Sequence, residues 1–438
     1  MMKKIVAIMV LLSAALFGQH FDAVSLGMGG NYIALSRGIN AITWNPANLS
    51  LPRGNNLEIN IFSMNLAAYN NSLAIREYNR YFTEEGHKGR WSEADKKDIL
   101  NMISDDGLRT YLNFHTNILG VAYKNFGFSF QSVTQGRVAL SENKKPFQIL
   151  LQGEEFTKNY ELKNSKLVDI DAFTAFKISM GYAYPFTIKE YIPGIDKIYV
   201  GANFNYYMGG ALVETRRSDG LIRRQLTVDD EDVLQYDLNL IGRTSHIENS
   251  FPAGNGFSFD IGASTSYRKN WLISWSFSNL FGNIYWSKNT EKHILSQRDS
   301  LLIEDLFEDR EEDTSVSTDT SMAIGGFSTR LPVHMRIGAA YLLREDLRLT
   351  LDWQQGFDTY FGNTSTPIVG LGAEYQPLNW LPLRAGMSLG GNHGFLFGLG
   401  FGVHVSFFQL DYSYAMNNGL WPTYSNGFFT ALSMRLRF

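Results

Sequence analysis

The chain has 438 residues, a formal net charge of -4 at pH 7 and no cysteine. Without cysteine it carries no disulfide, thiolate metal site, cysteine nucleophile or lipid-modified cysteine, and its weakly acidic balance gives no reason to expect nucleic-acid binding. Aromatic residues reach 14% and glycines number 40, although the mean hydropathy is only -0.16. This composition is typical of membrane strands that alternate lipid-facing and water-facing side chains.

The chain begins with the pattern of a secretory signal peptide. Lys3 and Lys4 precede the apolar run of residues 5–17, and Gly18 follows it. A membrane-spanning helix needs about 20 apolar residues, so this run is too short to be an anchor. We therefore expect residues 1–18 to be a cleaved signal peptide, with the cut between residues 18 and 20.

Residues 19–55 form a glycine-rich segment, which includes Gly29 and Gly30. It is too rich in glycine for a helix and shows no steady strand alternation, so we expect an irregular plug. Its tetrapeptide Trp44-Asn45-Pro46-Ala47 predicts a tight turn, because asparagine before proline avoids helix and bonds its own backbone. Direct ligand contact is the alternative role. A phosphate loop is excluded because no lysine follows the glycines.

The rest of the chain, residues 56–438, repeats one hairpin pattern. A glycine, two residues and a tyrosine precede a short polar turn and an aromatic strand, at Gly120–Tyr123, Gly181–Tyr184, Gly338–Tyr341 and Gly372–Tyr375. The short turns are expected at residues 124–125, 186–196, 268–270, 344–346, 376–381 and 406–407. A tyrosine at one height in several strands is typical of an interfacial aromatic girdle. Six turns join twelve strands, and a first strand at Leu57–Leu66 and a C-terminal strand complete fourteen.

The C-terminal strand ends at Phe438. Its aromatic and aliphatic residues alternate with Ser433, Arg435 and Arg437, as expected for a wall between lipid and water. A terminal aromatic of this kind resembles the signal read by the barrel-assembly machinery of the bacterial outer membrane. We thus expect an outer-membrane protein in contact with lipid and lipopolysaccharide. The fold predicted is an all-β, 14-stranded antiparallel transmembrane barrel with its N-terminal hatch inside the lumen.

An even strand count places both termini on the side of the short turns, which is periplasmic in such barrels. The connections at the other end are then extracellular, and the long loops are expected at residues 67–113, 136–169, 213–255 and 282–332. The first loop is predicted to contain helix, because Ser92 and Asp95 resemble a capping box. Aromatic and aliphatic residues of such helices either gather an apolar ligand or only cover the mouth: Tyr78, Tyr81, Phe82, Ile99, Met102 and Ile103.

The sequence gives little support for a metal site or a catalytic site. The carboxylates of residues 304–313 lack the glycine-turned spacing of a calcium loop, so we expect a solvated surface, no metal and no cofactor. The eight histidines are scattered, and none belongs to a recognisable nucleophile motif. We therefore do not expect an enzyme.

The glycine-rich segment resembles a known family. Gly27-Met28-Gly29-Gly30 and the stretch from Ala41 to Leu49 are similar to the hatch of FadL-type outer-membrane proteins and of the related PorV-like barrels. The resemblance implies fourteen strands, a hatch with an Asn-Pro-Ala motif, extracellular helices that gather ligand, and uptake of long-chain fatty acids or aromatic hydrocarbons by lateral diffusion. The function expected is uptake of hydrophobic small molecules.

A PorV-like scaffold that binds a protein partner, at the surface or in a secretion assembly, is the alternative. The long polar loops, in which four arginines face acidic runs, would suit protein contacts; these arginines are Arg216, Arg217, Arg223 and Arg224.

Overall fold

The last strand of the chain closes onto the first. In a computed structural model, β19 (Gly427–Arg437) pairs antiparallel with β1 (Leu57–Asn70), from Glu58 opposite Arg437 to Tyr69 opposite Gly427. The structure describes residues 21–83, 85–86, 91–152, 160–161, 166–226, 232–248, 250–302 and 316–438. The predicted signal peptide and the acidic run 304–313 lie outside these residues.

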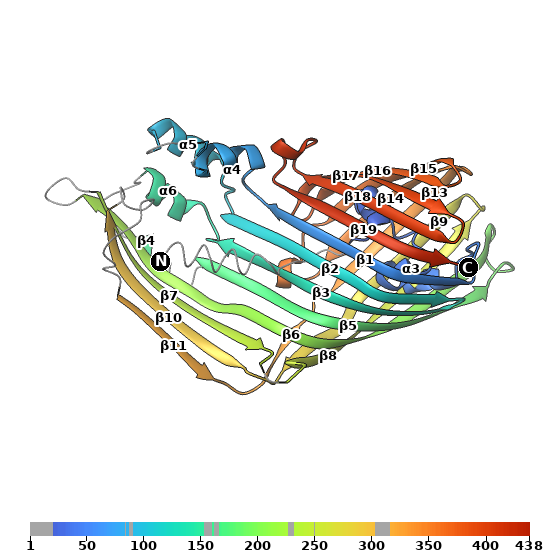
Figure 1. Cartoon of the computed structure of the whole chain (residues 1–438), viewed down its shortest axis with the longest axis horizontal. Coiled ribbons are helices and arrows are strands. Elements are labelled where there is room, and N and C mark those ends of the chain that lie inside the picture. Colours follow the sequence, from blue (N-terminus) through green and yellow to red (C-terminus); the bar gives the residue numbers. More distant parts are fainter. Residues whose placement is uncertain are drawn as a thin grey trace.

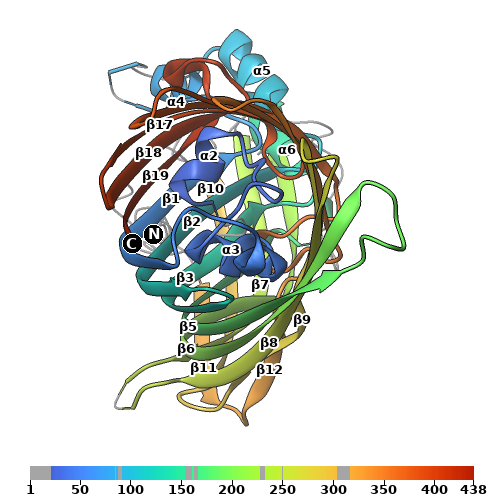
Figure 2. The same cartoon turned by 90° about the vertical axis from the view of Figure 1, so that its right-hand side faces the viewer.

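Fourteen of the 19 strands form a closed wall in which every neighbour is antiparallel (Figures 1 and 2). In order around the wall they are β1, β2 (Leu108–Tyr123), β3 (Phe126–Leu140), β5 (Val168–Thr187), β6 (Ile195–Leu226), β8 (Gly254–Tyr267), β9 (Trp271–Trp286), β13 (His334–Arg344), β14 (Leu347–Gly356), β15 (Ile368–Leu378), β16 (Leu381–Gly390), β17 (Gly394–Val405), β18 (Phe408–Asn417) and β19. The predicted 14-stranded barrel is confirmed, and each predicted short turn connects two wall strands. We call this end of the barrel the turn side and the other the loop side.

Alternation along the strands sorts side chains between the outer surface of the barrel and its lumen. In β19, Phe429, Ala431, Ser433 and Arg435 are buried inside the barrel, while the residues between them are partly exposed. The repeated tyrosines point outward near the turn side, as Tyr123 and Tyr184 illustrate by their roughly half-exposed side chains. Their glycines, three positions earlier, therefore face the lumen.

Two of the segments expected as loops are largely strand. Residues 213–255 contain the outer half of β6 and all of β7 (Asp232–His246), and residues 282–332 contain β10 (Glu291–Leu302), β11 (Val316–Ala323) and β12 (Phe327–Arg330). The outer half of β6 pairs with β7, β7 with β10 and β10 with β11, so a sheet extends beyond the barrel (Figure 1). The sequences of β10 and β11 lack the apolar alternation that marks a membrane strand, whereas in β7 the residues Leu234, Tyr236 and Leu238 alternate with polar ones.

Three helices lie on the loop side (Figure 1): α4 (Ile75–Phe82), α5 (Glu93–Met102) and α6 (Lys145–Gln152). The capping box predicted at the start of α5 is present, since the Ser92 side chain accepts from the Asp95 nitrogen and Asp95 accepts from Ser92. α6 was not predicted from the sequence. Among the described residues, no helix is long and apolar enough to cross a membrane.

Candidate functional site in the barrel lumen

The N-terminal segment lies inside the barrel, in the turn-side half of the lumen (Figure 2). It contains three short helices, α2 (Ala23–Gly27), α3 (Ile39–Trp44) and the 3₁₀ helix η1 (Pro46–Ser50), so the expectation of no helix was wrong. Each helix is only five or six residues long. Gly29, Gly30 and Gly38 adopt left-handed backbone angles between α2 and α3, so the glycines lie at the reversals rather than inside the helices. We call residues 21–51 the hatch.

Asn45 ties the hatch to the wall. Its Oδ1 accepts a hydrogen bond from the Ala47 nitrogen at 3.0 Å, which makes the turn predicted for Asn-Pro-Ala. Its Nδ2 donates to the Ala263 carbonyl at 3.1 Å and to Ser264 Oγ at 2.9 Å, both on β8. The Asn45 side chain is fully buried. The residue is therefore both a turn-maker and a tether.

The neighbouring Trp44 is held in a similar way. Its indole nitrogen donates to Asp22 Oδ2 at 2.7 Å, and its backbone oxygen accepts from Ser276 Oγ at 2.9 Å. The Trp44 ring lies under the guanidinium of Arg336 on β13, with the carbon of that group 4.8 Å from the ring centroid. The hatch residues picked out from the sequence thus hold the hatch in place.

Wall glycines make room for the hatch. A methyl group on Gly120 or Gly127 would lie 2.6 Å or 2.5 Å from the side chains of Ile39 or Ile42, closer than real contacts allow. The other wall glycines that a methyl group would drive into the hatch are Gly201, Gly262, Gly338, Gly370, Gly386 and Gly398. In the repeated hairpin motif, Gly120 and Gly338 therefore leave room for the hatch. A methyl group on Gly181 or Gly372 would first meet wall side chains, those of Asn203 and Thr350.

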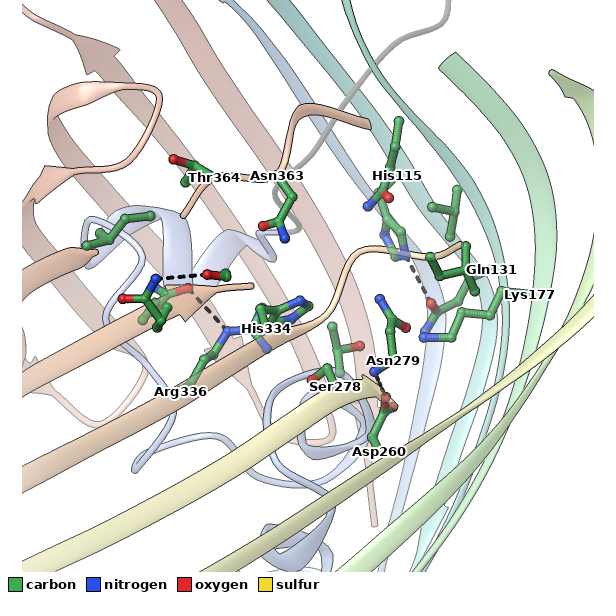
Figure 3. Close-up of a pocket in the computed structure, with 18 of the residues that line it drawn as sticks. His115, Gln131, Lys177, Asp260, Ser278, Asn279, His334, Arg336, Asn363 and Thr364 are labelled. Atoms are coloured by element: carbon green, nitrogen blue, oxygen red, sulfur yellow. Dashed lines mark hydrogen bonds between the residues drawn. The ribbon is translucent and has the colours of Figure 1, made fainter. Parts of the chain in front are cut away.

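A cavity of about 90 Å³ lies on the loop side of the hatch (Figure 3). Thr43 is the hatch residue that lines it, and the wall contributes mostly polar side chains. His115 Nε2 is 3.0 Å from Gln131 Oε1, and the Asn279 nitrogen donates to Asp260 Oδ1 at 2.8 Å. Val133, Phe173, Tyr207 and Leu331 add an apolar side. The cavity therefore has a polar and an apolar part.

Two cationic groups face this cavity, Lys177 and Arg336 (Figure 3). Arg336 is 6% exposed and donates from Nε to Gln354 Oε1 at 3.2 Å. Its Nη1 is buried without a hydrogen-bond partner among the described residues. Sequence reasoning missed these residues, because an inward polar side chain in a barrel strand looks the same whether it fills space or lines a cavity.

A loop closes the cavity from the loop side. Residues 357–367, between β14 and β15, carry the 3₁₀ turn η3 (Tyr360–Gly362), which contacts β3 and β5 across the lumen. Phe361 is 2% exposed, and its ring meets that of Phe173 at 4.8 Å in an edge-on arrangement. Asn363 and Thr364 of the same loop line the cavity. We call residues 357–367 the inner loop.

The wall is interrupted beside the cavity. The β9–β13 ladder ends at Ser278 opposite His334, and the β9–β12 ladder resumes at Asn283 opposite Arg330. Between them, two hydrogen bonds join the sides, from the Leu331 nitrogen to the Gly282 oxygen and from Asn279 Nδ2 to the Pro332 oxygen.

The backbone on the β9 side of this interruption is irregular. Asn279 and Phe281 adopt left-handed backbone angles, with φ of 60° and 56°. Phe281 points outward and is 79% exposed, whereas Leu331 is buried on the lumen side. Bulges of this kind are common beside functional sites.

The loop helices use most of their predicted apolar residues to pack against one another. Tyr81, Ile99 and Ile103 are buried in a cluster with Leu151 of α6, and Met102 packs against it. Tyr78 and Phe82 remain exposed on α4, with their rings stacked at 5.9 Å. The structure therefore separates the predicted set into an interior group and an exposed aromatic pair.

The C-terminal Phe438 lies at the closing seam. Its nitrogen donates to the Leu57 oxygen at 2.8 Å, and its ring stacks on Phe407 at 5.6 Å. The ring is 56% exposed on the turn side.

Comparison with known proteins places the fold. A family model described as "Family of unknown function (DUF5723)" matches residues 46–412, and no curated protein matches the chain. The toluene transporter TbuX of Ralstonia pickettii is similar in structure, with 12% identity, a TM-score of 0.51, and 95% of this chain and 98% of that chain covered. A TodX deltaS2S3 mutant monoaromatic hydrocarbon channel shows 11% identity, a TM-score of 0.52, and coverage of 95% and 99%. At such identities the likeness shows the fold alone, which is that of the FadL-type outer-membrane barrels expected from the sequence.

Proposed function

The chain belongs to the DUF5723 family and has a FadL-type barrel fold, and we propose that it is an outer-membrane channel for the uptake of hydrophobic small molecules. The observation that carries the proposal is the wall interruption between β9 and β13, which lies beside the cavity above the hatch. A cavity that borders a weak point in the wall gives a ligand a sideways path into the bilayer. The hatch blocks the straight path.

The side chains around the interruption suit such a path. Leu331 lines the cavity from inside, and Phe281 faces the lipid from outside. Pro332 cannot donate a backbone hydrogen bond, so this stretch cannot complete a regular ladder. Opening the wall here costs fewer hydrogen bonds than at any regular pair of strands.

The cavity must enlarge before it can hold a ligand. An engineered cavity of about 150 Å³ binds benzene, and the present volume of about 90 Å³ is smaller. The inner loop is the element that can make room, since it meets the opposite wall through the single buried ring of Phe361. Because Arg336 and Lys177 lie beside apolar residues, an elongated molecule with one polar end fits the lining better than a pure hydrocarbon.

Uptake into liposomes tests the proposal. Wild-type protein reconstituted in lipid should carry a fluorescent long-chain fatty acid into the vesicles faster than empty vesicles do, and should not release glucose. Leu331→Ala should raise the uptake severalfold, because it removes the side chain that seals the interruption. Leu351→Ala, on the exposed outer face of β14, is the matched control. Wild-type uptake no faster than in empty vesicles would refute the channel, and equal uptake by Leu331→Ala and wild type would refute the sideways path.

A second candidate function is a scaffold for a protein partner, which the sheet extension favours. Among the residues that the structure describes, β11 pairs with β10 alone, and residues 317–323 are exposed. Its register is regular, and Asp319 is its only charged residue in that range, so the usual protection of an edge strand is weak. A strand of another protein could add to this edge through main-chain hydrogen bonds.

A further inference from the structure

A second cavity, of about 520 Å³, lies between the hatch and the turn-side mouth of the barrel. Its lining comes from the hatch, from the linker at residues 52–55, and from the turn-side ends of β9, of β13 to β19 and of β1. It is separate from the cavity beside Arg336, which lies on the other side of the hatch. We call it the turn-side cavity.

The lining of the turn-side cavity is rich in arginine. Six arginines reach it, and the carboxylates in the lining are those of Glu58 and Glu374. The arginines are Arg37, Arg53, Arg348, Arg384, Arg435 and Arg437. Asp411 lies behind them as a third carboxylate and is fully buried. Positive groups therefore outnumber negative groups around this space.

The wall arginines already have acidic partners. Arg384 donates to Glu374 at 2.8 Å and to Asp411 at 2.7 Å, and Arg437 donates to Glu58 at 2.8 Å. Arg348 contacts Glu374, and Arg435 contacts Asp411. Each of the three carboxylates, Glu58, Glu374 and Asp411, is therefore already paired with a wall arginine.

The other two arginines, Arg37 of the hatch and Arg53 of the linker, are held by neutral oxygens. Arg37 donates to the backbone oxygens of Ala34 at 3.0 Å and Ser36 at 2.7 Å. Arg53 donates from Nε to the Asn55 oxygen at 3.1 Å and from Nη2 to the Lys124 oxygen at 2.8 Å. The carbonyls orient both guanidinium groups without neutralising them.

Three buried guanidinium nitrogens in the lining have no hydrogen-bond acceptor among the described residues. These are Nη1 of Arg53 and both Nε and Nη1 of Arg435, although Arg435 Nη1 lies 3.7 Å from Glu58 Oε1. The Arg435 side chain is 1% exposed. Leaving a buried donor of a charged group without an acceptor is unfavourable, because the group has lost its water and gained no partner. An oxygen-bearing anion in the cavity would satisfy such donors and neutralise the excess charge.

We propose that the turn-side cavity binds an anion, a carboxylate or phosphate group, between Arg37 of the hatch, Arg53 of the linker and the arginines of the wall. The planar guanidinium suits such groups because it can donate two parallel hydrogen bonds to their oxygens. Since the bound group would touch both hatch and wall, its occupancy would hold the hatch shut.

The anion has two sources with the same chemistry. It is either a free small anion or the headgroup of an amphiphile, for whose first carbons the cavity has room. This inference stands apart from the channel proposal, because binding is measured without any uptake and either result can fail alone.

Calorimetric titration of the full-length protein in a non-ionic detergent tests the inference. Inorganic phosphate, acetate and octanoate are titrated separately at constant ionic strength in chloride buffer. Saturable binding of phosphate or acetate is expected for a free anion, and octanoate binding much tighter than acetate is expected for a headgroup site. The double variant Arg37→Gln/Arg53→Gln should weaken the binding at least tenfold and should abolish the rise in melting temperature that the anion gives to wild type.

The matched control removes two exposed turn-side arginines that do not line the cavity, Arg268→Gln/Arg344→Gln, and should bind as wild type. Absence of saturable binding by all three probes would overturn the inference. So would equal binding by the Arg37/Arg53 double variant, provided it still migrates as a folded barrel in unheated gels. Binding of a hexaglutamate peptide without binding of the three probes would overturn it too, in favour of an acidic protein segment.

Discussion

Asn45→Ala should loosen the hatch while leaving the barrel folded. The change removes three hydrogen bonds of a fully buried amide, to the Ala47 nitrogen, the Ala263 oxygen and Ser264 Oγ. At about 1 kcal/mol each, the loss is roughly 3 kcal/mol. Since about 1.4 kcal/mol is a factor of ten, the population with an open hatch should rise about a hundredfold. The wall keeps its own ladder hydrogen bonds, so the global free energy of unfolding should change little.

Amide hydrogen exchange in detergent is the assay, because it reads local opening residue by residue. Amides of α3 and η1 should exchange about a hundredfold faster in the variant, while those of β15 to β18 keep their wild-type rates. Asn56→Ala, an exposed linker position, is the control and should alter neither set. Hatch rates within threefold of wild type would refute the role given to Asn45, and so would equal acceleration across hatch and wall.

Two more predictions concern the inner loop and the sheet edge. The chain has no cysteine, so a single Thr364→Cys reports on the inner loop. Adding Phe361→Ala, which removes about 3–5 kcal/mol of packing, should speed thiol labelling at least tenfold. An unchanged labelling rate would contradict the proposal that the inner loop moves to enlarge the cavity. If the scaffold role is real, Thr320→Lys on β11 should abolish co-purification of a stoichiometric protein partner and leave fatty-acid uptake intact, whereas retention of the partner would exclude this edge as the docking site.

The strands of the wall could be predicted from the sequence because each of them must place apolar side chains outside and mostly polar or small ones inside. Residues such as those of β19 alternate between lipid and lumen, and the turn side uses short connections. The closing pair of β1 and β19 followed from the strand count alone. The position of the hatch followed from the resemblance of Gly27–Gly30 and Ala41–Leu49, together with the need to plug a lumen of this width.

Features that depend on contacts between distant segments of the chain could not be predicted from the sequence. Phe281 has an ordinary aromatic side chain, and nothing in the sequence marks its left-handed backbone or the interruption beside it. The arginines of the turn-side cavity come from both ends of the chain, as Arg37 and Arg437 show. The glycines of the hairpin motif were visible, yet the reason for Gly120 and Gly338, contact with the hatch, requires the hatch to be placed first.

The wall glycines also constrain the order in which the molecule can assemble. α2 contacts β16, β17, β18, β19 and β1, so the segment made first touches the strands made last. Glycines such as Gly386 and Gly398 leave no side chains to fill the space that the hatch occupies. A ring that closed early would enclose an empty half-lumen, and the hatch would then have to thread through the turn-side mouth. The hatch is therefore best placed while β1 and β19 are still unpaired. The strands that are synthesised last would then assemble around the hatch, which is synthesised before them.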